Sequence, residues 1–371
     1  MSVILFTGGG TGGHIFPGLA IVDELRALVS SEIVWIGSSR GIDRELVEGH
    51  GVRFFGIPSG KLRRYFSFSN LFDVFRIVAG FFSALFLLIK IRPVLVFSKG
   101  GFVSVPPCLA AWFLRIPVIT HECDFSPGLA TRLNARFVTD IFVSYEETVQ
   151  AFPQTLRTKI TVTGNPVRPV FYTASAEKGR SFLGCADNTV PILFVQGGSL
   201  GARQINVIIA GCLEDLCKNF IVVHQTGSQN TDQAIGIDTP LVRERYKMFP
   251  FIREQMADVL AASEIVVARS GANTVWECAA QGKPMVLIPL EKGCSRGDQV
   301  ENARFFVSRG AAVMLTGTDA SPEKLVHVLS GLLANPKVHR DMADNCRALG
   351  SNRSATLIAG LIASRVTGGG R

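Results

Sequence analysis

The 371-residue sequence predicts an α/β protein with two Rossmann-like domains, each built on a parallel β-sheet. Short β-branched and aromatic runs alternate with longer helical patterns along the chain. Both halves open in the same way, with an apolar strand followed by a glycine-rich turn. The length agrees with two domains of roughly 100–200 residues each, and a hydrophobic content of 47% is ample for two cores.

Eleven apolar runs are the predicted strands. In chain order they are Val3–Thr7, Ile33–Ile36, Val94–Phe97, Val118–Thr120, Ile141–Val143, Lys159–Val162, Ile192–Val195, Phe220–His224, Ile265–Ala268, Met285–Ile288 and Ala312–Leu315. Because helical patterns separate them, we expect parallel sheets with helices on both faces.

The two halves are predicted to meet near Gly164–Pro169, where two prolines and a glycine cannot continue a helix or a central strand. The first half runs from its first strand into GGGTGGH, and the second runs from its first strand into GGSLGAR. We therefore predict domains over residues 1–164 and 165–349 that face one cleft. The last predicted element is an amphipathic helix over Ser354–Val366.

The positive charge of the chain is concentrated in one segment. Residues 53–115 contain nine basic residues and one acid, which accounts for the whole formal net charge of +8. The same segment contains 14 of the 33 aromatic residues. A basic, aromatic segment on a neutral body indicates contact with a membrane surface or a nucleic acid.

Apolar residues between Leu71 and Ile91 recur at helical spacing, which usually means a buried core helix. The wide apolar arc and its basic flanks favour partial burial in an anionic leaflet instead. The longest charge-free stretch, Ile77–Ile89, is shorter than the roughly 20 residues of a membrane span, so a peripheral contact is expected. Nucleic acid is disfavoured because aliphatic bulk interleaves the basic residues and no nucleic-acid motif is present.

The eight cysteines form no CxxC pair, which argues against a zinc ribbon or a thioredoxin-like motif. The chain start lacks the charged region of a signal peptide and is predicted to be a strand. We expect a reducing, cytoplasmic setting.

The first glycine-rich loop suits a ligand that approaches backbone N–H groups at a helix N-terminus. Gly8, Gly10 and Gly13 satisfy GxGxxG, but the second strand does not end in the acid that dinucleotide binding requires. A tight turn without a ligand is the alternative. His14 follows at the helix start, where the dipole favours a neutral imidazole suited to general-base catalysis, although a structural role is also open.

The second half offers two anion sites, at Gly197-Gly198-Ser199 and at the helix start Ser270-Gly271. Glu277, about two turns into that helix, could accept both hydroxyls of a ribose. Taken alone, the Ser-Gly segment could be an ordinary helix cap and Glu277 a residue on a solvated helix face. Their combination favours a nucleotide diphosphate as the ligand. After another strand, Glu122 and Asp124 could deprotonate a hydroxyl or orient a sugar, or form a polar turn; the segment matches no metal motif.

Six segments, in this order, resemble the MurG family: Gly9–Gly18, Lys99–Ser104, His121-Glu122, Gly164–Arg168, Gly197–Ser199 with Gly201–Arg203, and Arg269–Ala272. This family transfers N-acetylglucosamine to undecaprenyl-diphospho-N-acetylmuramoyl-pentapeptide (lipid I), giving lipid II in peptidoglycan synthesis. The resemblance implies the GT-B fold, a last helix (about 350–366) that crosses back to the first domain, inversion at the anomeric carbon, no cofactor, no essential protein-bound metal, and a place on the cytoplasmic face of the cell membrane.

The resemblance also implies site residues. The catalytic candidates are His14, Glu122 and Asp124, with His14 preferred as the base. The substrate-binding candidates are Thr11, Gly12, Gly13, Asp124, Arg168, Ser199, Asn206, Ile252, Ser270, Gly271, Ala272, Asn273, Thr274, Val275, Trp276, Glu277 and Gln299. The membrane patch is Phe75, Phe81, Phe82, Leu85, Phe86, Trp112 and Phe113.

Three positions depart from the family pattern: Asp124 replaces an asparagine, Leu200 a glutamine, and Phe102 a frequent tyrosine. Asp124 matters most, because an amide donates and accepts whereas an ionised carboxylate only accepts. Other functions remain open at this point: a GT-B glycosyltransferase acting on diacylglycerol, a UDP-N-acetylglucosamine 2-epimerase, and a non-catalytic nucleotide-binding membrane adaptor.

Overall fold

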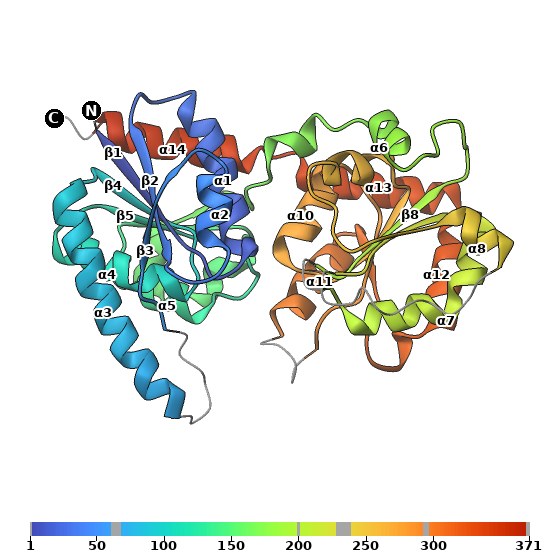
Figure 1. Cartoon of the computed structure of the whole chain (residues 1–371), viewed down its shortest axis with the longest axis horizontal. Helices are drawn as coiled ribbons and strands as arrows, with labels where there is room; N and C mark the ends of the chain where they lie inside the picture. Colours follow the sequence, from blue (N-terminus) through green and yellow to red (C-terminus); the bar gives the residue numbers. More distant parts are fainter. Residues whose placement is uncertain (1, 61–67, 199–200, 228–238, 292–296, 369–371) are drawn as a thin grey trace. The chain divides into compact units, whose positions relative to one another are not determined.

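The computed structural model describes residues 2–60, 68–198, 201–227, 239–291 and 297–368. The chain divides into two compact units, Met1–Arg168 with Arg353–Arg371, and Pro169–Asn352 (Figure 1). The expected boundary was after residue 164, and the division falls after Arg168.

The first unit is built on a seven-stranded parallel sheet in the order β3-β2-β1-β4-β5-β6-β7. Its strands are β1 (Val3–Thr7), β2 (Glu32–Ser38), β3 (Arg53–Ile57), β4 (Leu95–Ser98), β5 (Val118–Glu122), β6 (Asp140–Val143) and β7 (Ile160–Val162). Its helices are α1 (Gly12–Arg26), α2 (Asp43–Glu48), α3 (Phe68–Ile91), α4 (Val105–Phe113), α5 (Leu129–Asn134) and α14 (Ser354–Gly368).

Alternate residues of the central strand β1 enter two different cores. Ile4 and Phe6 pack with residues of α1 and α14, whereas Leu5 packs with residues of α3 and α4. This is the period-two alternation of a strand, and it explains why the whole of VILFT is apolar apart from its last residue. Helices therefore cover both faces of the first sheet.

The second unit is built on a six-stranded parallel sheet in the order β10-β9-β8-β11-β12-β13. Its strands are β8 (Ile192–Gln196), β9 (Ile221–Gln225), β10 (Tyr246–Phe249), β11 (Ile265–Ala268), β12 (Met285–Leu287) and β13 (Ala312–Met314). Its helices are α6 (Ala176–Phe182), α7 (Arg203–Asn219), α8 (Pro240–Arg245), α9 (Met256–Ala262), α10 (Ala272–Ala280), α11 (Asp298–Ser308), α12 (Pro322–Ala334) and α13 (Pro336–Gly350).

These sheets confirm the predicted fold class of two parallel-sheet, Rossmann-like domains. All eleven predicted strands are present, with ends that differ by at most two residues. The sequence analysis missed β3 and β10, which lie at sheet edges.

The C-terminal helix α14 belongs to the first unit, although it follows the whole second unit in the sequence (Figure 1). Its Ile358 and Ile362 lie in the same core cluster as Ile15 and Leu19 of α1. Two polar contacts fix its outer face: Thr356 Oγ1 donates to Glu24 Oε2 at 2.9 Å, and the Arg365 guanidinium lies 2.7 Å from Asp140 Oδ1. The helix thus closes one face of the first sheet.

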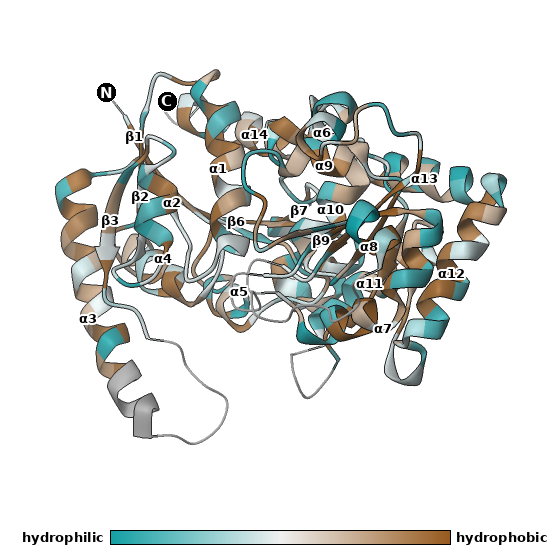
Figure 2. Ribbon diagram, turned by 45° about the vertical axis from the view of Figure 1, so that its right-hand side comes forward, coloured by the Kyte–Doolittle hydropathy of each residue, from teal (hydrophilic) through white to brown (hydrophobic). Residues whose placement is uncertain are grey.

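Helix α3 has two apolar sides with different surroundings. Gly80, Ala84 and Leu88, four residues apart, are buried. On the opposite side the exposed apolar residues also recur at helical spacing, and they are Phe75, Val78, Phe82, Phe86 and Ile89. Figure 2 shows the hydrophobic colouring along most of the described part of this helix.

The window Val74–Ile91 has a mean hydropathy of 2.1 and is only 17% buried. By length and composition it is long and apolar enough to cross a membrane, which corrects the expectation from the 13-residue charge-free stretch. That expectation failed because Arg76 and Lys90 interrupt the apolar run without ending the helix. However, the buried side of α3 packs on the sheet of its own unit, so lipid cannot surround the helix in this conformation.

The predicted membrane patch separates into two groups. Phe81 and Leu85 are half-buried and pack against the core of the first unit. The remaining members are exposed, and these are Phe75, Phe82 and Phe86 on α3 with Trp112 and Phe113 on α4. We call these five residues the exposed aromatic patch.

Candidate active site

The candidate residues of the first unit follow the carboxyl ends of three adjacent strands. Residues 11–14 come after β1, the turn Gly100-Gly101 comes after β4, and Glu122 ends β5. Because parallel strands end at the same sheet edge, these segments gather at the edge where such folds bind ligands.

His14 lies in the first turn of α1 and is half-exposed. Its ring rests against the turn Gly100-Gly101: a Cβ added to Gly101 would lie 2.9 Å from His14 Cδ2 and 2.9 Å from the Gly9 carbonyl oxygen. Gly101 also has φ = +78°, which favours glycine. Thr11 and Gly13 are exposed and Gly12 is half-buried, so these residues can reach a ligand beside His14.

A buried chain of polar groups lies beneath this turn. Lys99 Nζ lies 2.9 Å from His121 Nδ1, and His121 Nε2 lies 3.0 Å from the Gly164 carbonyl oxygen. Because an ammonium only donates, Nδ1 accepts and the ring proton resides on Nε2. Burial and the charge of Lys99 hold the pKa of His121 well below its ordinary value, so the ring is neutral. His121 is therefore a fixed connector and not a proton acceptor for substrate.

Glu122 is buried, and its carboxylate caps the turn that follows β5. Its Oε1 accepts from the backbone N–H groups of Cys123 (2.9 Å) and Asp124 (3.1 Å), and Oε2 accepts from that of Gly128 (2.8 Å). Both carboxylate oxygens are thus engaged by the backbone. Asp124 is half-exposed and is the more accessible of the two acids.

Glu122, Cys123 and Asp124 place potential ligand atoms within 4.8 Å of one another. Burial raises the pKa of the Cys123 thiol to about 12. Within this cluster, the backbone N–H groups engage the carboxylate oxygens of Glu122.

In the second unit the segment after β11 forms α10, and its residues divide between the helix faces. Asn273, Thr274 and Glu277 are half-exposed and share one face by helical spacing. Val275 and Trp276 are buried, and the Trp276 ring packs edge-on against Phe306. Among the donor-binding candidates of this helix, the half-exposed three can contact a ligand through their side chains, whereas Ala272, Val275 and Trp276 shape the backbone beneath it.

The start of α10 is tied to the start of α11. Ser270 Oγ donates to the Gln299 carbonyl oxygen at 2.7 Å, and Gln299 Oε1 accepts from the Leu290 backbone N–H at 3.0 Å. Buried Asn302 donates from Nδ2 to the Ser270 carbonyl oxygen at 3.2 Å. Space is open around the Cα of Gly271, where nothing lies within 4 Å of an added Cβ. The N-terminus of α10 is thus braced by α11, and the space beside the Gly271 Cα is open.

Asn206 on α7 is buried in a network. Its Nδ2 donates to the Thr226 carbonyl oxygen at 3.1 Å, so its Oδ1 accepts from His224 Nε2 at 3.1 Å, and His224 Nδ1 accepts from the Tyr246 hydroxyl at 3.0 Å. Burial lowers the pKa of His224 to about 4, which keeps the ring neutral. Asn206 therefore joins α7 to the end of β9 with both ends of its amide.

Two further candidates are held by neighbours. Ile252 is buried, and its backbone N–H donates to Gln225 Oε1 at 2.9 Å, which leaves its carbonyl as the group to consider for a ligand. The Arg168 guanidinium lies 5.1 Å from the centre of the Phe16 ring in the first unit. Ser199, the remaining candidate, and the departure Leu200 lie outside the described residues.

The comparisons with known proteins agree across the whole chain. Residues 4–143 match the glycosyltransferase family 28 N-terminal domain, and residues 192–358 match the corresponding C-terminal domain. A Treponema denticola protein named UDP-N-acetylglucosamine–N-acetylmuramyl-(pentapeptide) pyrophosphoryl-undecaprenol N-acetylglucosamine transferase is 53% identical, covering 99% of this chain and 98% of the relative. The chain belongs to the MurG family.

Structural similarity agrees with this membership. The crystal structure of Acinetobacter baumannii MurG superposes with a TM-score of 0.74 at 25% identity, covering 98% of this chain and 99% of that chain. A UDP-GlcNAc 2-epimerase from Neisseria meningitidis has the same fold, with a TM-score of 0.66 at 15% identity over 98% and 100% of the two chains. The chain is a glycosyltransferase of the MurG family, and its likeness to the epimerase concerns the fold alone.

Sequence reasoning about this MurG chain missed several residues that shape the site. Asp43 and Gln225 accept from backbone N–H groups beside the candidates, and Lys99 Nζ contacts the His121 ring. Arg269 Nη1 donates to Gln204 Oε1 and to the Ile288 carbonyl oxygen at 3.0 and 2.8 Å. Lys99 and Arg269 stood in the segments that resemble the family, which was a signal for them. No sequence signal marked Asp43 or Gln225, because each binds a backbone N–H group that is distant in the sequence, Gly10 and Ile252 respectively.

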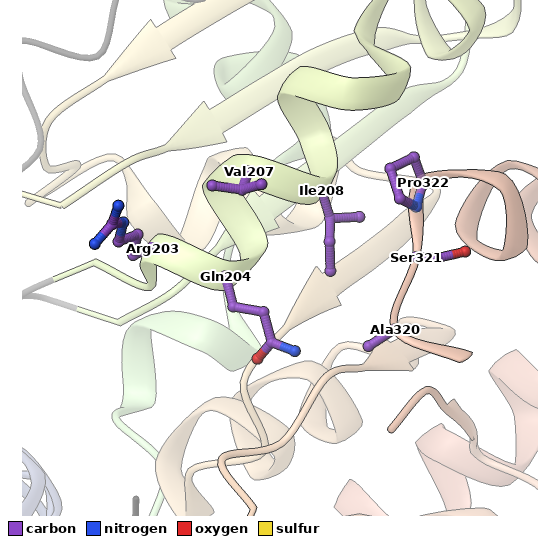
Figure 3. Close-up of a pocket in the computed structure, with 7 residues that line it drawn as sticks. All are labelled: Arg203, Gln204, Val207, Ile208, Ala320, Ser321 and Pro322. Carbon is purple, nitrogen blue, oxygen red and sulfur yellow. The ribbon is translucent and has the colours of Figure 1, made fainter. Parts of the chain in front are cut away.

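An open groove lies between the start of α7 and the start of α12, and the seven residues that line it are Arg203, Gln204, Val207, Ile208, Ala320, Ser321 and Pro322 (Figure 3). None of the predicted donor-binding residues that the structure describes is among them. The groove therefore differs from the candidate donor site around α10.

Proposed function

We propose that this chain transfers N-acetylglucosamine from UDP-N-acetylglucosamine to the C4 hydroxyl of the muramoyl unit of lipid I, giving lipid II with inversion at the anomeric carbon. The observation that carries the proposal is the 53% identity over nearly the whole length of a relative named for this transfer. The two glycine turns around His14 and the braced N-terminus of α10 support it by supplying an accessible base and an anion site.

On the acceptor side, His14 removes the proton from the attacking hydroxyl. The ring is half-exposed, so its imidazole can reach a bound hydroxyl as a general base must. Thr11, Gly12 and Gly13 line the same turn and face the sugar and diphosphate of the donor, next to the attacking hydroxyl. Asp124 orients the acceptor, whereas Glu122 holds the turn on which Asp124 sits.

On the donor side, the diphosphate carries growing negative charge as UDP leaves. The N-termini of α7 and α10 stabilise it with backbone N–H groups, and Ser199, Ser270, Gly271 and Arg168 assist. Glu277 accepts the ribose hydroxyls, and Asn273, Thr274 and Gln299 complete the pocket. Asn206 and Ile252 act through the backbone positions that their hydrogen bonds fix.

The decisive test offers the purified protein UDP-N-acetylglucosamine with each of two acceptors, and without an acceptor, in parallel. Transfer to a polyprenyl-diphospho-N-acetylmuramoyl peptide, with a β-linked product, is the expected result. Transfer to diacylglycerol would favour the other lipid glycosyltransferase, and formation of UDP-N-acetylmannosamine without acceptor would favour the epimerase. Turnover no faster than background with every acceptor would favour the non-catalytic adaptor.

Replacing Glu277 by alanine is expected to raise KM for UDP-N-acetylglucosamine by about 10- to 100-fold, since removing a hydrogen bond to a charged group costs roughly 1.5–3 kcal/mol. Steady-state kinetics with varied donor measure it. Glu301 on α11 is the matched control, because its replacement changes the same charge on another helix of this unit. An unchanged donor KM in the Glu277 variant would remove the ribose contact from the proposal.

We further propose that the exposed aromatic patch brings the enzyme to an anionic membrane surface on the cytoplasmic side. Phe75, Phe82 and Phe86 are each exposed by more than 60% on one side of α3. Arg76 and Lys90 lie on the same helix and can contact anionic lipid headgroups. Because the opposite side of α3 is fixed to the sheet, this geometry supports peripheral contact.

Replacing Phe82 and Phe86 by serine is expected to weaken binding to vesicles of anionic phospholipid by about 100-fold, at roughly 1.5 kcal/mol or more for each aromatic side chain. Co-sedimentation with vesicles measures it, and high salt should weaken binding further. The thermal midpoint should hardly change, because neither ring is buried. Exposed Leu28, replaced by serine, is the control, and equal binding by all three proteins would contradict the membrane contact.

A further inference from the structure

Asp43 is a fully buried carboxylate at the start of α2. Both of its oxygens accept from the Gly10 backbone N–H, at 2.9 and 3.0 Å, and Oδ2 also accepts from the Ser38 backbone N–H at 2.9 Å. These bonds tie the glycine turn after β1 to the end of β2. Burial raises the pKa of Asp43, and the two N–H groups oppose that rise by favouring the carboxylate.

The glycine turn is shaped around this carboxylate. A Cβ added to Gly9 would lie 1.9 Å from Asp43 Oδ2, which no rearrangement of a fully buried side chain can relieve cheaply. Gly10 has φ = +83°, so its N–H reaches the carboxylate from a conformation that glycine adopts freely. Two of the glycines in GGGTGG thus serve an internal anion, which differs from the expectation that this backbone serves a ligand.

The Gly9-Gly10 turn, held by Asp43, in turn supports the position of the His14 ring. The Gly9 carbonyl oxygen and the His14 ring lie on the same Gly101, each 2.9 Å from the position of an added Cβ. The other end of the turn is held by Trp35, whose indole N–H donates to the Gly8 carbonyl oxygen at 2.9 Å. Asp43 and Trp35 therefore fix the backbone between β1 and α1, from which His14 projects.

We propose that Asp43 is a positioning residue for the transfer reaction, which holds the Gly9-Gly10 turn so that His14 meets the acceptor hydroxyl. This inference rests on the proposed function. Asp43 itself touches no substrate, because its side chain has no exposed surface. It acts through backbone N–H groups, and the effect is transmitted along Gly9 and Gly10 to the start of α1.

The first measurement compares Asp43→Asn with the wild type in the transfer assay. An amide keeps the shape but turns one acceptor into a donor facing an N–H group, so the turn must shift. We expect kcat to fall by about 10- to 100-fold, since a displacement of about 1 Å at a catalytic group has such an effect. KM for UDP-N-acetylglucosamine should stay within about twofold, because the donor candidates Ser270–Glu277 lie in the other unit.

The matched control is Asp23→Asn, an acid of the same unit that pairs with His50 on the surface at 2.6 Å. Its kcat and donor KM should equal those of the wild type. A Gly10 amide resonance that shifts in Asp43→Asn and not in the control would report the loosened turn without any assay.

A double-mutant cycle with His14→Ala separates positioning from mere structural support. If Asp43 acts through His14, the double variant is no slower than His14→Ala alone. If the two losses in kcat multiply, or if Asp43→Asn retains full activity, the inference is overturned. If the wild type itself fails to glycosylate the muramoyl acceptor, it is the proposed function that fails.

If Asp43→Asn does not fold, Gly9→Ala tests the same positioning role of the turn. Its methyl group pushes the turn away from an intact carboxylate and leaves α2 unchanged in sequence. The same loss in kcat, again absent on the His14→Ala background, would support the inference. Full activity of Gly9→Ala would contradict it.

Discussion

Replacing His14 by alanine is expected to lower kcat for the transfer by about 10²- to 10⁴-fold, the usual contribution of a general base. The reason is local: His14 is a half-exposed imidazole at the N-terminus of a 15-residue helix, against a turn that two glycines keep open. Donor KM should change by less than about twofold, since the donor candidates Ser270–Glu277 belong to the other unit. Steady-state kinetics with both substrates varied would measure this.

His50→Ala is the matched control, because His50 is also a half-exposed histidine of the first unit but is paired with Asp23 away from the glycine turns. It should retain wild-type kcat. Added imidazole should restore part of the activity of His14→Ala, because it can replace the missing base. A His14→Ala protein with unchanged kcat and an unchanged thermal midpoint would exclude His14 as the base.

The sequence was sufficient to predict the fold because the central strands are marked by continuous runs of apolar residues. Central strands such as β1 and β8 are buried on both faces and are therefore continuous apolar runs. The two missed strands lack that signal: β3 reads RFFGI, and β10 reads YKMF without a β-branched residue. The other two edge strands, β7 and β13, contain ITV and AVM and were predicted.

The candidate site was predicted by segment, and what the segments could not reveal is the direction of each side chain. Val275 and Trp276 stand beside Glu277 in the sequence, yet helical geometry turns them into the core. Asn206 is bound to His224 on a strand 18 residues away, so its burial depends on tertiary packing. The spacing of residues in the sequence indicates which of them share a face of a helix or strand. Hydrogen bonds between side chains of different elements can be identified only from the folded structure.

Asp43 illustrates the same limit for the first glycine loop. The sequence analysis sought an acid at the end of the second strand, where it would hold a ribose, and found none. The acid is five residues beyond that strand end and turns back to the Gly10 N–H. The Gly10 N–H is therefore bound to an internal carboxylate, which the local sequence pattern could not reveal.

Replacing Glu122 by alanine is expected to lower the free energy of unfolding by about 3–5 kcal/mol, because three backbone N–H groups lose a charged acceptor. Glutamine keeps one carbonyl oxygen and should lose about 1–3 kcal/mol. Denaturant unfolding measures both changes. Glu146, replaced by alanine, is the control: this exposed acid of the same unit follows β6, and its loss should leave stability nearly unchanged.

The kinetics of Glu122→Gln then distinguish the two roles that the sequence left open. A carboxylate whose oxygens both face backbone N–H groups is a poor proton acceptor for substrate, so we expect kcat within about tenfold of the wild type and an unchanged pH profile. A folded Glu122→Gln protein with wild-type stability and a kcat lowered by about 10³-fold would reverse the assignment. In that case Glu122 would be the base, and the turn would have to open to release it.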